Sequence, residues 1–177
     1  MSGMKITPEY LEQNRALHAM GEYGISGQRW APTVQNVCRV AGSRDVLDYG
    51  CGRRTLEASL GWPIRNYDPC IAGLDAPPEP ADVVVCTDVL EHIEPECLDE
   101  VLDDLQRVTR RIGFFVIATR AAEKTLPDGR NAHLIQQPLA WWAPRLEKRF
   151  KVSQLREMAG EFAVVVRPLD GAAPAAQ

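Results

Sequence analysis

The sequence lacks any long hydrophobic run. No apolar stretch approaches the roughly 18 residues that a membrane-spanning helix needs. The first residues, Met1 to Lys5, also lack the apolar core of a secretory signal. These two absences argue against a membrane-spanning or secreted protein, so we expect a cytoplasmic protein that makes no membrane contact.

Sequence patterns that bind metals are missing as well. The five cysteines are scattered, none belongs to a Cys-x-x-Cys pair, and no histidine stands at ligand spacing from them. An odd number of scattered cysteines is typical of reduced thiols in a cytosolic protein. We therefore expect no metal site.

Basic residues are fewer than acidic residues. Lysine and arginine total 20 against 24 aspartates and glutamates, which gives a net charge of −4. A broad phosphate-binding face is therefore not indicated, and nucleic acid is disfavoured as a partner. Hydrophobic residues make up 45% and charged residues 25% of the 177 residues, which is ordinary for a soluble domain with its own core. We expect one domain over residues 1–169 and a disordered tail over residues 170–177.

The stretch 46–52 combines the parts of a nucleotide-binding turn. A short buried strand runs into Asp48, and Gly50 and Gly52 follow it closely. Glycine lacks a Cβ atom, so it can turn sharply and let a ligand approach the backbone. Apolar positions in residues 56–60 predict a short helix whose free N–H groups point back at the same place. A strand, a glycine turn and a helix start together predict a nucleotide pocket.

Two further predicted strands end in polar residues that would face the same pocket. Residues 64–67 are followed by Asp68, about twenty positions after Asp48, where an acidic side chain can accept hydrogen bonds from ribose hydroxyls. A third apolar run, residues 83–86, leads into the segment Thr-Asp-Val-Leu-Glu-His at 87–92. Open α/β sheets bind ligands beyond the carboxyl ends of their strands, so this segment should border the pocket too.

The pieces VLDYGCG, NYDP and ADVVVCTDVLEHI, in this order, resemble class I S-adenosylmethionine-dependent methyltransferases, in particular the small subgroup with DVLEH after the fourth strand. The resemblance covers residues 45–120. It implies a three-layer, Rossmann-like α/β fold with a mostly parallel sheet of about six strands and a C-terminal antiparallel hairpin. It also implies S-adenosyl-L-methionine as the cofactor, bound by Asp48, Tyr49, Gly50, Cys51, Gly52, Asp68, Pro69, Thr87 and Asp88.

The segment 69–81 departs from the family pattern. It is rich in proline and shows no periodicity, whereas a full-length member has a helix and a strand at this place. We therefore expect the third strand to be missing or reduced to a loop. The acidic contact to the adenine amino group would be lost with it, which leaves the loop residues Pro69, Cys70, Ile71 and Asp75 to border the adenine.

A second departure is Arg54, which stands where the family has a third glycine. We expect its side chain to point outward. The alternative is that Arg54 engages a carboxylate of the cofactor or the substrate. An arginine that filled the pocket would abolish cofactor binding.

The N-terminal segment predicts two helices, over residues 8–20 and 29–41. In many methyltransferases such a piece folds over the cofactor, so the resemblance implies that residues 1–42 form a helical lid. Tyr23 or Trp30 could contact the cofactor from this lid, although each is more often ordinary packing.

The clearest helical pattern spans residues 94–111, where apolar residues repeat at intervals of three and four. Acidic residues at its start and arginines at its end suit the helix dipole, and Gly113 is expected to stop it. The rest of the chain predicts a strand over 114–118, a polar loop over 120–134, a helix from Pro138 that includes Phe150, and a hairpin of strands 152–155 and 162–166.

Three residues are candidates for the chemistry. Methyl transfer from a sulfonium is an in-line displacement, so the enzyme chiefly holds the acceptor in place and excludes water. A base is needed only where the acceptor must lose a proton. Asp88 and His92 stand four positions apart at a strand's end, and His133 lies in an Asn-Ala-His-Leu stretch similar to a Gly-His-Leu stretch of related enzymes. The alternative role for His92 is to cap or pack at the start of the next helix.

The sequence favours methyl transfer to oxygen or nitrogen of a small-molecule acceptor, and it leaves two other functions open. A nicotinamide-dependent reductase shares the glycine turn, but it needs a glycine where Thr55 stands and a Tyr-x-x-x-Lys pair that the chain lacks. A catalytically silent relative that acts as a partner subunit would keep the fold without turnover. The sequence identifies neither the acceptor nor the number of subunits.

Overall fold

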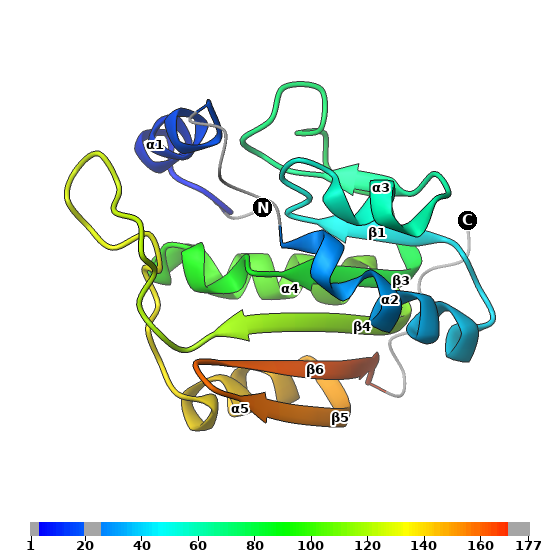
Figure 1. Cartoon of the computed structure of the whole chain (residues 1–177). Coiled ribbons are helices and arrows are strands. Elements are labelled where there is room, and N and C mark those ends of the chain that lie inside the picture. Colours follow the sequence, from blue (N-terminus) through cyan, green and yellow to red (C-terminus); the bar gives the residue numbers. More distant parts are fainter. Residues whose placement is uncertain (1–3, 20–25, 170–177) are drawn as a thin grey trace.

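A single mixed sheet organises the chain in the computed structural model, which describes residues 4–19 and 26–169 (Figure 1). Its strand order is β2-β1-β3-β4-β6-β5. The first four strands are parallel: β1 (Val46–Tyr49), β2 (Arg65–Tyr67), β3 (Ala81–Thr87) and β4 (Thr109–Ala118). The hairpin of β5 (Phe150–Met158) and β6 (Glu161–Pro168) adds to β4 in the antiparallel sense. This confirms the predicted α/β fold with a C-terminal hairpin, although both hairpin strands are longer than predicted. The predicted tail at 170–177 lies outside the described residues.

Helices cover both faces of the sheet, which makes three layers (Figure 1). On one face, α2 (Gly27–Ala41) and α3 (Thr55–Leu60) bury Val34 and Leu56 against Phe114 of β4. On the other face, α4 (Leu98–Val108) and α5 (Leu139–Glu147) bury Leu102 and Trp142 against apolar side chains of β3 and β4. The central strands are therefore apolar on both sides, as expected for a parallel sheet between helices.

The α2 helix is a layer of the core, so only α1 (Pro8–Ala19) of the two N-terminal helices is placed to cover a pocket. Trp30 of α2 packs edge-on against Phe114 with ring centroids 5.6 Å apart. This is the packing role that its residue type favours. Tyr23 lies outside the described residues.

The connection from β2 to β3 contains no strand or helix, and β2 forms the edge of the sheet. This confirms the prediction that the third strand is missing. The connection is held against α4, because the Arg107 guanidinium donates a hydrogen bond to the Pro78 carbonyl oxygen at 2.9 Å. Prolines without a free N–H make this segment unsuited to a new edge strand.

The helix predicted over residues 94–111 is wrong at both ends. Its first turn is the short 3-10 segment η2 (Pro95–Cys97), which follows another such segment, η1 (Leu90–His92), and α4 ends at Val108. Thr109 is already extended, so the chain passes from α4 into β4 without a loop. Gly113 does not stop a helix. It lies inside β4, where an added Cβ would come within 2.7 Å of Val166 Cγ2. The helix from Pro138 likewise ends earlier than predicted, and Phe150 belongs to β5.

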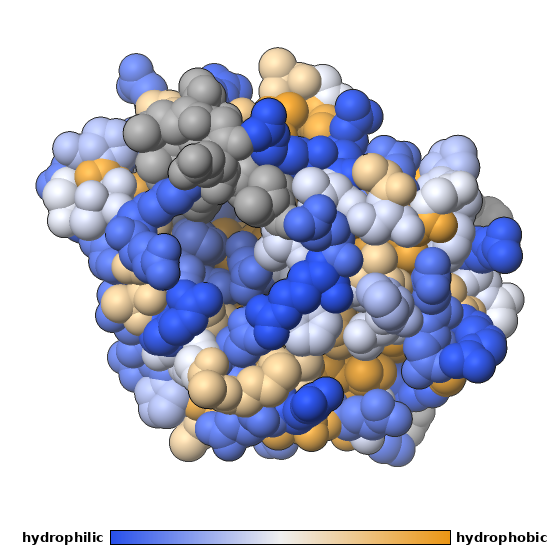
Figure 2. All heavy atoms as spheres, viewed as in Figure 1, coloured by the Kyte–Doolittle hydropathy of each residue, from blue (hydrophilic) through white to orange (hydrophobic). Residues whose placement is uncertain are grey.

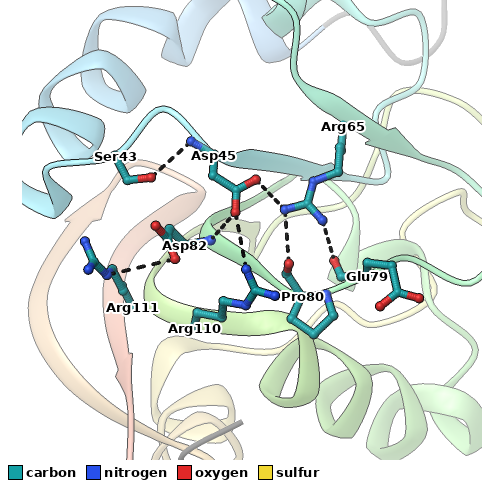
Figure 3. Close-up of polar contacts among 8 residues, drawn as sticks. All are labelled: Ser43, Asp45, Arg65, Glu79, Pro80, Asp82, Arg110 and Arg111. Carbon is teal, nitrogen blue, oxygen red and sulfur yellow. Dashed lines mark hydrogen bonds and ion pairs between the residues drawn. The ribbon is translucent and has the colours of Figure 1, made fainter. Parts of the chain in front are cut away.

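A polar network explains why the arginines after Val108 belong to the strand (Figure 3). Asp45, just before β1, accepts hydrogen bonds from the Arg65 guanidinium and from the Asp82 N–H at 3.1 Å. The Arg110 guanidinium lies 3.7 Å from the same carboxylate, and Arg111 lies 3.9 Å from Asp82. The network ties together the amino-terminal ends of β1, β2, β3 and β4. It lies at the opposite end of these strands from the glycine turn.

Hydrophilic residues dominate the face seen in Figure 2, while hydrophobic side chains gather in its lower part, over β4 and β6. Among the residues that the structure describes, no helix combines the length and the apolar composition needed to cross a membrane.

Candidate active site

A cavity of about 530 Å³ opens beyond the carboxyl ends of β1, β2 and β3. In this sheet β1 and β3 are neighbours. The connection after β1 leads to β2 on one side, and the connection after β3 leads to β4 on the other side, so a crevice forms between them where the strand order reverses. The loop that follows β4 and the helix α1 border the same region, at the left of Figure 1. The cavity therefore lies where open α/β sheets bind their ligands.

The glycine turn, residues 50–52, forms one wall of the cavity. Gly50 and Gly52 have positive φ angles of 80° and 49°, a conformation that favours glycine. An added Cβ at Gly50 would lie only 2.4 Å from Val89 Cγ2. The N–H groups of Gly50 and Cys51 both donate to the Tyr67 carbonyl oxygen, at 2.8 and 3.0 Å. The turn is thus fixed to the end of β2, and it leaves bare backbone facing the cavity.

Asp68 faces the cavity from the end of β2. Its side chain is buried, and its two carboxylate oxygens accept hydrogen bonds from the Gly52 N–H at 3.1 Å and the Cys70 N–H at 2.9 Å. A carboxylate has about four acceptor positions, so these bonds orient Asp68 and leave it able to accept more. Pro69 and Cys70 line the cavity beside it, whereas Ile71 and Asp75, which we also expected near the adenine, do not.

The other predicted cofactor residues lie around this wall without lining the cavity by their side chains. Asp48 is buried at 4% exposure, and its pKa is raised to about 7 by burial and by the neighbouring acids Asp68 and Glu57. Tyr49 points to the α4 side of the sheet, where its hydroxyl donates to Asp104 at 2.9 Å. The side chains of Cys51 and Thr87 are buried as well, so any contact of theirs to a ligand would come from the backbone.

Arg54 keeps the backbone conformation of the glycine that it replaces. Its φ is 57°, in the left-handed region, directly before α3 begins. The side chain is exposed and does not line the cavity. The position thus still makes the turn into the helix, and the arginine leaves the pocket open.

Asp88 directly follows β3 and has a positive φ of 53°. An aspartate tolerates this conformation better than most residues, and such local strain is common at functional sites. Its carboxyl group lines the cavity and forms a hydrogen bond with the Ser26 side chain. Burial raises the pKa of Asp88 above its usual range, and the Ser26 hydrogen bond opposes that shift.

His92 and His133, here called the histidine pair, line the cavity from the segments after β3 and β4. Their rings lie edge to face with centroids 4.7 Å apart. His92 Nδ1 is 2.8 Å from the Ala132 carbonyl oxygen, and His133 Nδ1 is 2.7 Å from the Arg120 carbonyl oxygen. A carbonyl oxygen only accepts hydrogen bonds, so each Nδ1 carries a proton, and Nε2 is the ring nitrogen that can act as an acceptor. The structure therefore brings together the two histidines singled out in the sequence.

Glu91 is a buried residue of this site to which we gave no role from the sequence. It is completely buried, and its Oε1 accepts a hydrogen bond from the Ala118 N–H at 3.0 Å. Its Oε2 is also buried but has no hydrogen-bond partner among the described residues. Burial, reinforced by Asp88, raises the pKa of Glu91 to about 8. The sequence signal was an acidic residue between the apolar pair Val89-Leu90 and His92.

The helix α1 borders the cavity, and Tyr10 and Asn14 of this helix line it. The start of α1 and the residue before it are hydrogen-bonded to the segment that carries His92. The Thr7 N–H and hydroxyl donate to the two oxygens of Glu94 at 2.8 and 2.7 Å, and the Tyr10 hydroxyl donates to the His92 carbonyl oxygen at 2.5 Å. The position of α1 is thus coupled to the segment that carries His92.

This architecture matches a known family. A family model described as a methyltransferase domain matches residues 16–163, which is most of the chain. The chain belongs to this methyltransferase family. Membership confirms the resemblance drawn from the three sequence motifs, and it sets aside the nicotinamide-dependent reductase. No curated protein sequence matches this methyltransferase significantly.

Solved structures with low sequence identity share the fold of this methyltransferase. The Burkholderia thailandensis 1,6-didemethyltoxoflavin-N1-methyltransferase, solved with 1,6-didemethyltoxoflavin and S-adenosylhomocysteine, is 17% identical with a TM-score of 0.66, over 96% of this chain and 94% of that one. The Synechocystis magnesium protoporphyrin IX methyltransferase, solved with S-adenosylhomocysteine, is 17% identical with a TM-score of 0.57, over 80% and 83%. An Escherichia coli rRNA methylase is 18% identical with a TM-score of 0.51, over 93% and 78%.

Proposed function

We propose that this chain transfers a methyl group from S-adenosyl-L-methionine to oxygen or nitrogen of a small-molecule acceptor. The observation that carries the proposal is the two-sided cavity. One wall, after β1 and β2, combines the glycine turn with Asp68, and a second wall, from the segments after β3 and β4, presents the histidine pair. A donor and an acceptor can therefore lie in one cavity with the reacting atoms between them.

The glycine wall fits the proposed donor. Bare backbone at Gly50 and Gly52 lets the methionine part approach closely, and a side chain at Gly50 would collide with Val89. Asp68, already oriented by two backbone N–H groups, can accept the hydrogen bonds of the ribose hydroxyls. Pro69 and Cys70 then border the adenine in place of the missing third strand. Bound S-adenosylmethionine supplies a methyl group on a positively charged sulfur.

The histidine wall serves the acceptor. A neutral imidazole that presents Nε2 can accept the proton that a hydroxyl or amine loses when it is methylated. The Arg120 carbonyl keeps a proton on Nδ1 of His133, and Asp88 lines the same cavity. Tyr10 and Asn14 of α1 also line the cavity, and a bound acceptor beside them would restrict access of water to the reacting atoms.

Two observations favour a small-molecule acceptor over RNA, and a third supports a cytoplasmic location of the protein. The chain carries a net charge of −4, whereas binding a phosphate backbone rewards a basic surface. The toxoflavin and protoporphyrin enzymes, named after small molecules, share the fold at 17% identity each, although an rRNA methylase shares it too. All five cysteines are free and buried, which is compatible with a reducing compartment.

Two variants test the proposal on its two walls separately. Asp68→Ala removes the ribose contact and should weaken the binding of S-adenosylhomocysteine roughly 10- to 100-fold, because hydrogen bonds to a charged group contribute about 1.5–3 kcal/mol. His133→Ala should keep that binding within about threefold but lower methyl transfer about 100-fold or more. Isothermal titration calorimetry measures the first effect, and a screen of metabolites for methylated products measures the second.

Asp75→Ala is the matched control for Asp68→Ala, because Asp75 is exposed in the same loop and lies outside the cavity lining. Binding by wild type but no methylated product from any acceptor class would support the silent partner subunit instead. Equal binding by Asp68→Ala and wild type would show that the ribose contact is assigned wrongly.

A further inference from the structure

Glu91, His92 and His133 converge at the histidine wall of the cavity. Each offers one atom that can bind a metal ion, and these three atoms all lie within 4.8 Å of one another. The residues come from two segments, the 3-10 turn after β3 and the loop after β4, and they meet because β3 and β4 are neighbours in the sheet. Two imidazole nitrogens and one carboxylate oxygen are a ligand set that binds first-row divalent metals in proteins.

The imidazoles are held as metal-binding histidines usually are. Such histidines donate their other ring N–H to a backbone carbonyl or a carboxylate, which fixes the ring and its tautomer. Here Nδ1 of His92 lies 2.8 Å from the Ala132 carbonyl oxygen, and Nδ1 of His133 lies 2.7 Å from the Arg120 carbonyl oxygen. Both rings therefore keep Nε2 as the atom that can coordinate a metal.

The surroundings of Glu91 are a second, independent indication of a cation site. Its side chain has no exposed surface, and its Oε1 is fixed by the Ala118 N–H at 3.0 Å. Its Oε2 is equally buried and accepts no hydrogen bond from any residue that the structure describes. A buried carboxylate oxygen without a partner is unfavourable, and a bound cation would satisfy it.

We propose that Glu91, His92 and His133 bind one divalent first-row cation, with Zn²⁺ the best match. Imidazole ligands suit Zn²⁺, whereas Mg²⁺ and Ca²⁺ prefer oxygen ligands throughout. Three protein ligands leave a fourth tetrahedral position. His92 and His133 line the cavity, so this position faces the space where the acceptor binds.

A cation at this site would restrict the acceptor to molecules that are methylated at oxygen, an inference that rests on the proposed function. A cation with an open position binds a hydroxyl oxygen of the acceptor and lowers its pKa, so the oxygen loses its proton to solvent before it is methylated. The two histidines then act as ligands, and the cation takes over the activation. The acceptor would accordingly be methylated at oxygen and not at nitrogen.

Metal binding can be measured without any turnover. The full chain, stripped of metal with a chelator, is titrated with Zn²⁺ in a calorimeter and with Co²⁺ by visible absorption. Wild type should bind one equivalent of each, with the intense absorption of a four-coordinate Co²⁺ site. Glu91→Gln and His133→Ala should each weaken Zn²⁺ binding by about tenfold or more. Circular dichroism checks that both variants are folded. If Glu91→Gln does not fold, His133→Ala, at the cavity wall, still tests the metal site.

Cys70→Ser is the matched control, because Cys70 lines the same cavity and a thiol is a rival zinc ligand. This variant should bind Zn²⁺ as wild type does. Loss of binding in Cys70→Ser, unchanged binding in His133→Ala, or no saturable binding by wild type would each overturn the metal site. Titration of the same samples with S-adenosylhomocysteine separates the two proposals. Donor binding without metal binding overturns the metal site alone, and metal binding without donor binding overturns the proposed function alone.

Discussion

Among single residues, Asp48 is a buried acid of the candidate site whose ionisation lowers the free energy of unfolding. It is buried at 4% exposure, and burial together with Asp68 and Glu57 raises its pKa to about 7, from a value near 3.9 in an unfolded chain. Between about pH 4 and pH 7 the folded state therefore binds more protons at this group than the unfolded state does. The contribution of Asp48 to the free energy of unfolding falls as the pH rises through this range and stays low above it.

We predict that Asp48→Asn stabilises the protein, and does so more at pH 8 than at pH 5. The amide keeps the size of the side chain but cannot ionise, so the gain at pH 8 is at most about 4 kcal/mol and the gain at pH 5 is smaller. Urea unfolding of the cofactor-free protein at the two pH values measures the difference. Asp75→Asn, at an exposed aspartate, should change the stability little at either pH. A gain from Asp48→Asn that is the same at both pH values would contradict the prediction.

The residues that sequence reasoning found at the site are those with a local signature. Gly50 and Gly52 follow a buried strand, and Asp68 ends the next one, so their placement beside one cavity could be predicted from spacing alone. Glu91 was missed because its role depends on a partner distant in the chain. Nothing in the sequence shows that its neighbour His92 meets His133, or that its Oε2 has no hydrogen-bond partner within residues 4–19 and 26–169.

At the scale of elements, the ends of helices and strands were predicted less well than their existence. The periodic pattern of α4 was correct, but the arginines after Val108 were assigned to the helix dipole. In the structure Arg110 and Arg111 lie in β4 and form ion pairs with Asp45 and Asp82 (Figure 3). A basic residue suits a helix end and a strand start equally well. The choice depends on acidic partners that only the folded sheet brings near.

The attachment of α1 is the element-level feature that most affects access to the cavity. Glu94 is buried at 5% exposure and accepts hydrogen bonds from the Thr7 N–H and hydroxyl. We predict that Glu94→Ala releases α1. Amide hydrogen exchange over residues 8–19 should then become faster, while exchange in β3 and β4 stays unchanged. Binding of S-adenosylhomocysteine should weaken by at most about tenfold, because Glu94 does not line the cavity and acts only through the position of α1.

Glu96→Ala provides the comparison for this experiment, since Glu96 lies two positions further on and is exposed. Its exchange pattern should match that of wild type. Faster exchange throughout the sheet of Glu94→Ala would mean that Glu94 supports the whole fold and not the attachment of α1 in particular.

At the scale of the whole molecule, the cavity depends on the strand order. The glycine turn follows β1, Asp68 follows β2, Asp88 and His92 follow β3, and His133 lies beyond β4. These four positions come together only because β2, β1, β3 and β4 lie side by side in that order. The fold class followed from the family resemblance, but the depth of the cavity and the meeting of the two histidines depend on packing that no local pattern encodes.

A ligand that contacts all these loops should stabilise the molecule as a unit. We predict that S-adenosylhomocysteine, at 100 times its dissociation constant, raises the free energy of unfolding by about 2.7 kcal/mol. For a chain of this size that corresponds to an increase of roughly 5–10 °C in Tm. NADH at the same concentration should leave Tm unchanged, because Thr55 stands where a nicotinamide-binding turn needs a glycine. The same shift with NADH would show that the cavity does not distinguish S-adenosylhomocysteine from a nicotinamide dinucleotide. No shift with S-adenosylhomocysteine would show that the cavity does not bind this ligand, and the outward position of Arg54 would then have to be reconsidered.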